Sequence, residues 1–273
     1  MTAHVSFQGE HGAYSESAAI NFFGKNVQTF PCPTFSNALD AIYGGECEHA
    51  MLPIENSIEG NVGESYDLLY ETDLKVIGET YQKIDHCLIG TASDMAKVQT
   101  IYSHPQALGQ CRKFIQSRGI KIVPTYDTAG SVPIVKKLDD STVACIASED
   151  AAIIHGLPII ARNIANSLDN YTRFLIMGKK ETECKGDTKT SIMFTLKHEP
   201  GALYNIIGVL SKAGINLTKI ASRPRKGMVW EYNFYLDFED SCQREQNVVA
   251  LEEICKTCSF LKVLGTYPVI RFG

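Results

Sequence analysis

Short apolar runs alternate with segments of helical spacing from the start of the chain to about residue 180. The runs that we interpret as strands cover residues 4–8, 27–30, 49–53, 75–80, 100–103, 121–124 and 142–146. The segments with helical spacing lie between them, at residues 18–23, 37–43, 64–70, 106–118, 129–138 and from residue 149. Strands that alternate with helices predict parallel sheet covered by helices, which is an α/β fold.

Two long extended segments suggest that this α/β part has two lobes. We interpret residues 74–90 as a crossing from one lobe to the other and residues 173–177 as the return strand. The predicted boundaries are a domain at 1–180, a first lobe at about 1–76 and 160–180, and a second lobe at about 77–159. Two lobes joined in this way leave a cleft between them, where ligands commonly bind.

The pattern changes after a polar stretch without periodic apolar residues, which we take as a linker at 181–189. The rest of the chain, residues 190–273, predicts a second domain. Its elements are a strand at 190–197, a helix from Pro200-Gly201 to Gly214, a strand at 215–224, a turn at 225–227, a strand at 228–238, a helix at 243–257 and a strand at 261–269. The order βαββαβ is the ferredoxin-like arrangement.

Composition and charge exclude several classes of protein. With 44% hydrophobic and 21% charged residues, the chain is neither collagen, coiled coil nor disordered. A net charge of −5 without a long basic run argues against nucleic acid as a partner. The apolar stretches, such as residues 157–161, are far shorter than the roughly 20 residues that span a bilayer, so no membrane partner is expected.

The N-terminus and the cysteines predict a cytoplasmic location. Residues 1–7 have neither the basic nor the apolar region of a signal peptide. The nine cysteines are odd in number and scattered, which is typical of reduced thiols in a core. Cys255 and Cys258 form a lone CxxC pair, and the seven histidines lack metal-ligand spacing, so we expect no metal site.

Four polar clusters lie at the ends of predicted strands, where α/β sheets place functional groups. They cover residues 9–15, 53–60, 103–106 and 170–174. Each has a structural interpretation as a turn or helix cap. Each also has a functional interpretation. The first cluster offers amides at a helix N-terminus that could bind an anion. The second places a carboxylate beside a side-chain amide, and the other two place polar groups toward the cleft.

Taken together and in this order, the clusters resemble the motifs of prephenate dehydratases. Phe7 to Ser15 resembles the opening motif of that family. Pro53-Ile54-Glu55-Asn56-Ser57 with Gly60, Ser103-His104-Pro105-Gln106 and Asn170-Tyr171-Thr172-Arg173-Phe174 resemble three further motifs. No chorismate mutase segment precedes the first motif, so we expect a monofunctional enzyme.

The resemblance implies an enzyme that dehydrates and decarboxylates prephenate to phenylpyruvate in phenylalanine synthesis, without metal or organic cofactor. The catalytic residues it implies are Thr172, Glu55, Asn56, Ser103 and Gln110. The substrate-binding residues we expect are Arg173, Gly12, Ala13, Tyr14, Ser15 and Phe174. Thr172 is the expected donor to the departing hydroxyl, and Glu55 is its rival. The two lobes are expected to resemble type II periplasmic-binding-protein folds.

The C-terminal domain resembles the ACT regulatory domain appended to these enzymes. Gly201-Ala202-Leu203 matches its Gly-Ala-Leu motif, and 221–224 matches its Glu-Ser-Arg-Pro motif except that Ala221 replaces Glu. The resemblance implies that L-phenylalanine binds as an allosteric effector at an interface between ACT domains of a homodimer or homotetramer. The residues expected at that site are Gly201, Ala202, Leu203, Asn216, Leu217, Ser222, Arg223 and Pro224.

Two other functions stay open at this stage. Arogenate dehydratase is the nearer alternative, because its substrate differs from prephenate only in an amino-acid centre that replaces the keto group. A non-catalytic amino-acid-sensing binding protein is the more remote alternative, because two lobes around a cleft also suit a solute-binding protein. The set of Thr172, Glu55 and Asn56 favours an enzyme over a sensor.

Overall fold

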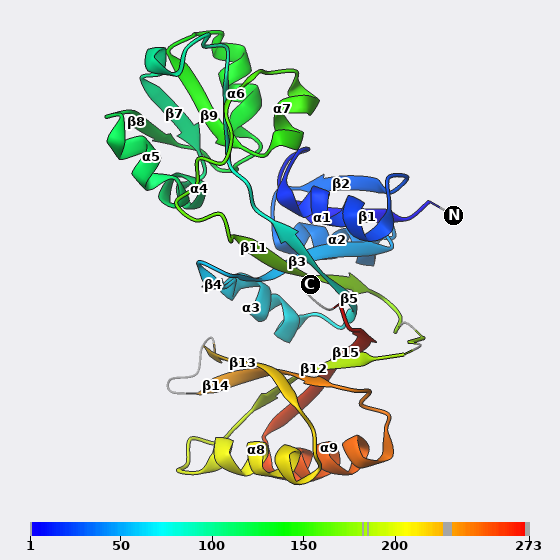
Figure 1. The fold of residues 1–273 in the computed structure, drawn as a ribbon. Helices are drawn as coiled ribbons and strands as arrows, with labels where there is room; N and C mark the ends of the chain where they lie inside the picture. Colours follow the sequence, from blue (N-terminus) through cyan, green and yellow to red (C-terminus); the bar gives the residue numbers. More distant parts are fainter. Residues whose placement is uncertain (1, 182, 185, 226–230, 271–273) are drawn as a thin grey trace. The chain divides into compact units, whose positions relative to one another are not determined.

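The first lobe is built on a sheet in which β1 (His4–Gln8), β2 (Gln28–Cys32) and β3 (His49–Asn56) run parallel (Figure 1). Its strand order is β2-β1-β3-β11-β5, with the short β4 paired to β3. The remaining elements of this sheet are β4 (Gly60–Asn61), β5 (Lys75–Lys83) and β11 (Tyr171–Gly178), and its helices are α1 (Tyr14–Phe23) and α2 (Phe35–Gly44). The computed structural model describes residues 2–181, 183–184, 186–225 and 231–270.

The second lobe has a five-stranded sheet of order β10-β6-β9-β7-β8. Its strands are β6 (Cys87–Gly90), β7 (Thr100–Ser103), β8 (Lys121–Pro124), β9 (Val143–Ala147) and β10 (Ile159–Ala161). Its helices are η1 (Met95–Lys97), α4 (Pro105–Gln110), α5 (Arg112–Ser117), α6 (Ser131–Leu138) and α7 (Glu149–His155). Successive residues of a strand face opposite sides, and Leu88 and Ile89 therefore enter separate cores on the two faces.

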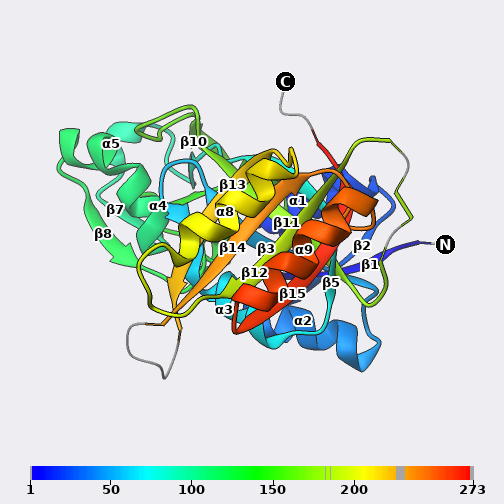
Figure 2. The ribbon, with the colours of Figure 1, turned by 90° about the horizontal axis from the view of Figure 1, so that it is seen from below.

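The C-terminal residues form the predicted ferredoxin-like fold. Its elements are β12 (Thr188–Thr195), α8 (Ala202–Lys212), β13 (Leu217–Pro224), β14 (Tyr232–Glu239), α9 (Glu245–Thr257) and β15 (Phe260–Pro268). The strands pair antiparallel in the order β13-β14-β12-β15. Figure 2 shows α8 and α9 side by side across one face of this sheet. Phe194, Leu210 and Ile254 lie wholly buried in the core between sheet and helices.

The other face of the C-terminal sheet is covered by α3 (Gly63–Glu71), a helix from far earlier in the chain (Figure 1). The rings of Tyr66 and Tyr235 meet edge to face with centroids 4.5 Å apart. The Tyr235 hydroxyl donates a hydrogen bond of 2.5 Å to the Tyr66 carbonyl oxygen. Burial raises the pKa of Tyr235, so this hydroxyl keeps its proton at neutral pH.

Contacts between residues therefore group the chain differently from the predicted domain boundaries. One compact unit consists of Met1–Gly60 and Tyr81–Phe174, and the other of Asn61–Thr80 and Leu175–Gly273. The second unit takes in α3 because that helix packs against the C-terminal sheet. Two strands, β5 and β11, run from one unit into the other.

Two predicted elements are interrupted in the structure. At each break, residues from a distant part of the chain form hydrogen bonds with the backbone groups. The helix expected at 106–118 divides at Cys111 into α4 and α5. The Asn166 amide donates to the Gln110 carbonyl oxygen at 2.7 Å, and its side-chain oxygen accepts from the Lys113 amide at 3.0 Å. The extended stretch at 74–90 divides into β5 and β6.

The remaining departures from the prediction are small. The short strands β4 and β10 were not expected. The predicted turn at 225–227 and the start of the strand at 228–238 lie largely outside the described residues. In the described part of the chain, no helix combines the length and the apolar character needed to cross a bilayer.

Candidate active site

The centre of the candidate site is the pair formed by Asn56, the last residue of β3, and Thr172, the second residue of β11. Asn56 Nδ2 donates to Thr172 Oγ1 at 3.0 Å and to Asn170 Oδ1 at 2.7 Å. Asn56 Oδ1 accepts from the amides of Ile58 and Glu59, both at 3.0 Å. These backbone bonds fix which way round the Asn56 amide group lies. Thr172 Oγ1 is therefore an acceptor toward Asn56, and its own proton stays available for another partner.

A chain of buried polar side chains continues from Asn56 into the interior. Asn170 Nδ2 donates to Gln110 Oε1 at 3.0 Å. The same Gln110 oxygen lies 2.8 Å from His86 Nε2, and His86 Nδ1 lies 3.2 Å from the Tyr14 hydroxyl oxygen. Four predicted residues, Asn56, Thr172, Gln110 and Tyr14, are thus joined through His86 and Asn170. The sequence reasoning missed His86 altogether and assigned no role to Asn170.

Burial sets the protonation states along this chain. His86 is 2% exposed, and burial lowers its pKa, so its imidazole is neutral at pH 7. Burial raises the pKa of Tyr14 well above its ordinary value, and the Tyr14 hydroxyl donates to the Asp85 carbonyl oxygen at 2.6 Å. The chain from Tyr14 to Thr172 therefore carries no net charge near neutral pH.

The other two predicted catalytic residues are Ser103 and Glu55. Ser103, at the end of β7, is wholly buried and donates to the Ile146 carbonyl oxygen at 2.6 Å. Its hydroxyl proton is therefore engaged within the second lobe. Glu55 precedes Asn56 on β3, and alternation along a strand directs the two side chains to opposite faces. One carboxylate that contacts the polar chain is that of Glu59, whose Oε1 lies 3.5 Å from Gln110 Nε2.

Alternation along β11 also sets the faces of the two residues that follow Thr172. Arg173 is 6% exposed, and its place on β11 directs it to the face opposite Thr172. Phe174 is 2% exposed and is part of the core. Alternation therefore directs Arg173 away from the Thr172 hydroxyl, whereas Phe174 shares the face of Thr172. The roles of both residues in binding substrate stay predictions.

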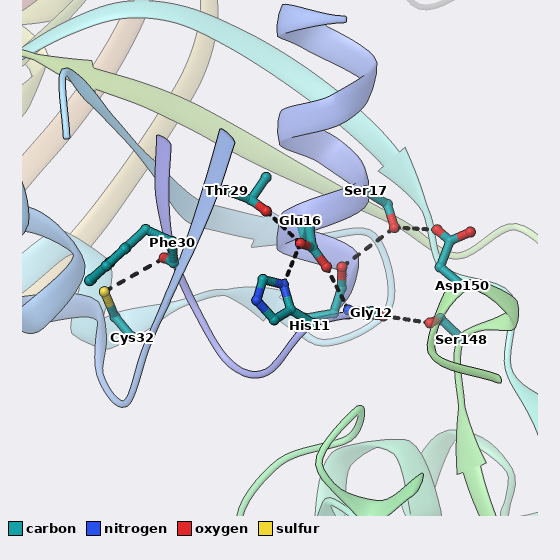
Figure 3. Close-up of polar contacts among 10 residues, drawn as sticks. His11, Gly12, Glu16, Ser17, Thr29, Phe30, Cys32, Ser148 and Asp150 are labelled. Carbon is teal, nitrogen blue, oxygen red and sulfur yellow. Dashed lines mark hydrogen bonds and ion pairs between the residues drawn. The ribbon is translucent and has the colours of Figure 1, made fainter. Parts of the chain in front are cut away.

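The loop before α1 is organised by the buried carboxylate of Glu16 (Figure 3). Its Oε2 accepts from the Gly12 amide at 2.6 Å. Its Oε1 accepts from the Thr29 hydroxyl at 2.6 Å and lies 2.7 Å from His11 Nδ1. The Gly12 amide is therefore bonded to Glu16 in this structure, and its expected role in binding substrate stays a prediction.

The same loop also contacts the second lobe (Figure 3). The Ser148 hydroxyl donates to the Gly12 carbonyl oxygen at 2.5 Å, and the Ser17 hydroxyl donates to Asp150 Oδ2 at 2.6 Å. Gly12 has a φ of 89°, and a Cβ there would lie 2.4 Å from the Ala151 Cα. A glycine is thus required at this position both by its backbone conformation and by the close approach of α7.

Among the other predicted anion-binding amides, those of Tyr14 and Ser15 remain available. The Ala13 amide donates to the Glu10 carbonyl oxygen at 3.0 Å. Within the described residues, no group accepts from the amides of Tyr14 and Ser15, which begin α1. Two free amides at the start of a helix favour binding of a carboxylate.

The residues expected to bind the effector occupy two ends of the C-terminal domain. Gly201, with a φ of 84°, Ala202 and Leu203 begin α8. Asn216 and Leu217 follow that helix, whose 11 residues span about 16 Å at 1.5 Å per residue. Asn216 Nδ2 donates to Glu239 Oε2 at 2.9 Å. One chain thus cannot place Gly201 and Asn216 around the same small ligand.

The rest of the expected effector set lies on β13, where Arg223 faces α3. Arg223 Nη2 lies 3.3 Å from Asp67 Oδ2 of that helix. Ala221 pairs with Tyr235, which packs on Tyr66 of α3. The position at which the motif usually has Glu therefore faces α3, as Arg223 does, whereas Ser222 and Pro224 are exposed.

Metal ligands are not assembled in the described part of the chain. No group of three or more His, Cys, Asp or Glu side chains there is arranged to hold a metal ion.

Comparison with known proteins places these observations in a family. The family model described as prephenate dehydratase matches residues 5–182. A bifunctional chorismate mutase/prephenate dehydratase of Aquifex aeolicus is 38% identical over 97% of this chain and 73% of its own length. The arogenate dehydratase/prephenate dehydratase 2 of Arabidopsis thaliana is also 38% identical, over 97% of this chain and 72% of its own length.

Two solved structures share the fold over nearly the whole chain. A prephenate dehydratase of Arthrobacter aurescens in complex with L-Phe is 28% identical, with a TM-score of 0.87 over 97% of this chain and 90% of that chain. A protein described as GqqA, a novel type of quorum quenching acylase, is 33% identical, with a TM-score of 0.87 over 98% of both chains. The motifs, the fold and these matches agree, and the chain belongs to the prephenate dehydratase family of lyases.

Proposed function

We propose that this enzyme converts prephenate to phenylpyruvate, water and carbon dioxide. The observation that supports this most directly is the geometry of Asn56 and Thr172. Because Asn56 donates to Thr172 Oγ1, the Thr172 proton is free to point at the oxygen of a departing hydroxyl group. Hydrogen-bond donors placed in advance where charge develops are among the strongest contributions to catalysis.

The reaction sets clear demands on the site. The bond between the ring and its carboxylate breaks, and its electrons complete the aromatic ring as carbon dioxide leaves. The C4–O bond breaks with its electrons on oxygen, which takes up one proton and leaves as water. In our proposal Thr172 donates to this oxygen, and the free amides of Tyr14 and Ser15 receive a substrate carboxylate. Glu55 remains the rival donor, although alternation along β3 directs it away from Asn56.

The remaining predicted roles are part of the same proposal. Gln110 lies within the polar chain and offers its Nε2 amide as a second donor. Ser103, whose hydroxyl proton is engaged, can still accept a hydrogen bond. We propose no metal or organic cofactor in the reaction.

Regulation by L-phenylalanine is the second part of the proposal. It is supported by the ferredoxin-like domain with its two motifs, which we propose to be an ACT domain at residues 190–273, following a catalytic domain at 1–180. It is also supported by the L-Phe in the Arthrobacter aurescens structure. Since Gly201 and Asn216 lie at opposite ends of α8, we propose that two chains form the effector site, in a homodimer or homotetramer.

A direct assay tests the proposal. Purified protein is given prephenate, and formation of phenylpyruvate is followed with and without L-phenylalanine. Arogenate is given in parallel, because the Arabidopsis relative carries both activities in its name. Turnover of prephenate that L-phenylalanine changes supports both parts, whereas turnover of arogenate alone favours the alternative substrate.

The same preparation separates the remaining possibilities. Chorismate tests the expectation of a single activity, since relatives of this chain are bifunctional. An acylated quorum-sensing signal tests the activity named for the 33% identical structure. Binding of L-phenylalanine without any turnover favours the sensor. The cytoplasmic location is tested by fractionating cells that express the chain.

A further inference from the structure

His86 lies within the polar chain between Tyr14 and Gln110, and the hydrogen-bond directions around it indicate its role. Its ring is 2% exposed, and it lies between β5 and β6, where the predicted long strand is interrupted. The Ile84 amide donates to the Asn170 carbonyl oxygen at 2.8 Å, and the Ile164 amide donates to the His86 carbonyl oxygen at 3.1 Å. The backbone around His86 is thus held at both ends.

The Gln110 side chain is oriented by only a few groups. A carboxamide can lie either way round, and its neighbours decide which end faces them. Gln110 Oε1 lies 3.0 Å from Asn170 Nδ2 and 2.8 Å from His86 Nε2. The Asn170 amide is itself oriented by Asn56, whose direction is fixed by backbone amides. Gln110 Oε1 must therefore be the acceptor in both contacts.

This arrangement requires a hydrogen on His86 Nε2. If the hydrogen were on Nδ1, the lone pair of Nε2 would face the oxygen of Gln110, and the two would repel. Rotation of the Gln110 amide would relieve that contact, but it would set Gln110 Nε2 against Asn170 Nδ2, which is also a donor. The tautomer of His86 is thus coupled to the direction in which Gln110 presents its NH2 group.

We propose that His86 is a positioning residue that, as the Nε2–H tautomer, holds the Gln110 carboxamide with its NH2 group on the side of Glu59, whose Oε1 lies 3.5 Å from Gln110 Nε2, where that group can donate during the reaction. Only one part of this inference rests on the proposed function, namely the identity of the group to which the Gln110 NH2 donates. With the hydrogen on Nε2, Nδ1 is an acceptor, and the single Tyr14 proton lies between it, at 3.2 Å from the Tyr14 oxygen, and the Asp85 carbonyl oxygen, at 2.6 Å. The titratable groups near the ring are Tyr14, Asp85 and Cys87 on its own segment, and the Cys111 thiol beyond Gln110. Burial raises the pKa of Tyr14, Cys87 and Cys111, so all three stay protonated.

Two measurements on the full chain test this proposal. The first records the 15N shifts of the His86 ring, assigned by comparison with His86→Gln. We expect a protonated Nε2 and an unprotonated Nδ1 at pH 7. A ring with its hydrogen on Nδ1, or with hydrogens on both nitrogens, would overturn the proposal. This result does not depend on any enzymatic activity, so it stands even if prephenate is not turned over.

The second measurement compares kcat and KM for prephenate in three proteins. His86→Gln keeps a donor near the Nε2 position, whereas His86→Leu removes it at similar volume. We expect kcat of His86→Leu to fall at least about tenfold with little change in KM, and His86→Gln to recover most of that loss. An unchanged kcat in His86→Leu, or equal losses in both variants, contradicts the positioning role. If His86→Leu does not fold, the 15N shifts of the His86 ring and the kcat of His86→Gln still test the positioning role.

Discussion

At the scale of single residues, direction matters as much as proximity. Asn56 touches Thr172 through its NH2 group because its oxygen is held by the amides of Ile58 and Glu59. A polar pair at this distance has two possible directions, and only one leaves the Thr172 proton free. The motif predicts which residues come together, but the backbone bonds decide which one donates.

Replacing Asn56 tests that direction. In Asn56→Asp the donor becomes an acceptor, so Thr172 would turn its own proton toward the new carboxylate. We expect kcat for prephenate to fall by roughly a hundredfold or more. Asn26→Asp, at an exposed position, makes the same chemical change far from the site and should keep the wild-type rate. A wild-type kcat in Asn56→Asp would refute the assigned direction.

Gly12 provides a second test at this scale. Gly12→Ala would place a Cβ 2.4 Å from the Ala151 Cα at a φ of 89°. Gly24 has a φ of 90° with nothing within 4 Å of the corresponding Cβ. Both substitutions place an alanine at nearly the same positive φ, so the difference between them reports the contact with α7. We expect Gly12→Ala to lose at least about 2 kcal/mol more in the free energy of unfolding than Gly24→Ala, measured in urea. Equal losses would argue against the close approach of α7.

The buried imidazole of His86 predicts a pH dependence of stability. Burial lowers its pKa, whereas the unfolded chain takes up a proton near pH 6.5. Below that pH the unfolded state binds more protons than the folded state, so stability decreases as pH falls. We expect His86→Gln to lose less stability than wild type between about pH 6.5 and pH 5, measured by urea denaturation across that window. Parallel pH profiles would contradict the assignment.

At the scale of elements, α3 is the segment that the sequence explains least. Its residues predict the helix at 64–70 well, because Tyr66 and Leu69 recur on one face and both are buried. Nothing near it in the sequence indicates that this face packs on β13 and β14. Asp67 and Arg223 lie 156 residues apart, and pairs at such separation are invisible to periodicity. The divided helix α4–α5 has a similar cause, since Asn166 comes from a distant loop.

The contacts at the carboxyl end of α3 make a contribution to the free energy of unfolding that can be tested. Lys262 Nζ donates to the Leu69 carbonyl oxygen at 3.1 Å and also to the Thr72 carbonyl oxygen. A cation at this end of a helix is stabilising because the last carbonyl groups carry partial negative charge. We expect Lys262→Met to lower the free energy of unfolding by about 1 kcal/mol. Lys121→Met, at an exposed position of the strand β8, is the control, and equal effects would argue against the cap.

At the scale of the whole molecule, the C-terminal domain indicates how an effector site would be assembled. Gly201 and Asn216 are separated by the length of α8, although the resemblance assigns both to one ligand. Two chains related by a two-fold axis would bring the start of α8 in one chain to the start of β13 in the other. The sequence alone predicts the two motifs but not their separation.

A mixed dimer tests this arrangement. Gly201→Val and Asn216→Ala homodimers should each fail to bind L-phenylalanine by calorimetry. A dimer of one Gly201→Val chain and one Asn216→Ala chain would contain one site with both defects and one intact site. We expect it to bind one L-phenylalanine per dimer. No binding by the mixed dimer would show that each site belongs to a single chain.

The measurement that tests the central claim most directly is the rate of phenylpyruvate formation by Thr172→Val and Thr172→Ser. Both variants change the same side chain, but only Thr172→Ser keeps a hydroxyl that can donate. We predict that kcat of Thr172→Val falls by roughly a hundredfold or more with a modest change in KM, and that Thr172→Ser keeps most of the activity. Wild-type turnover by Thr172→Val would contradict the account.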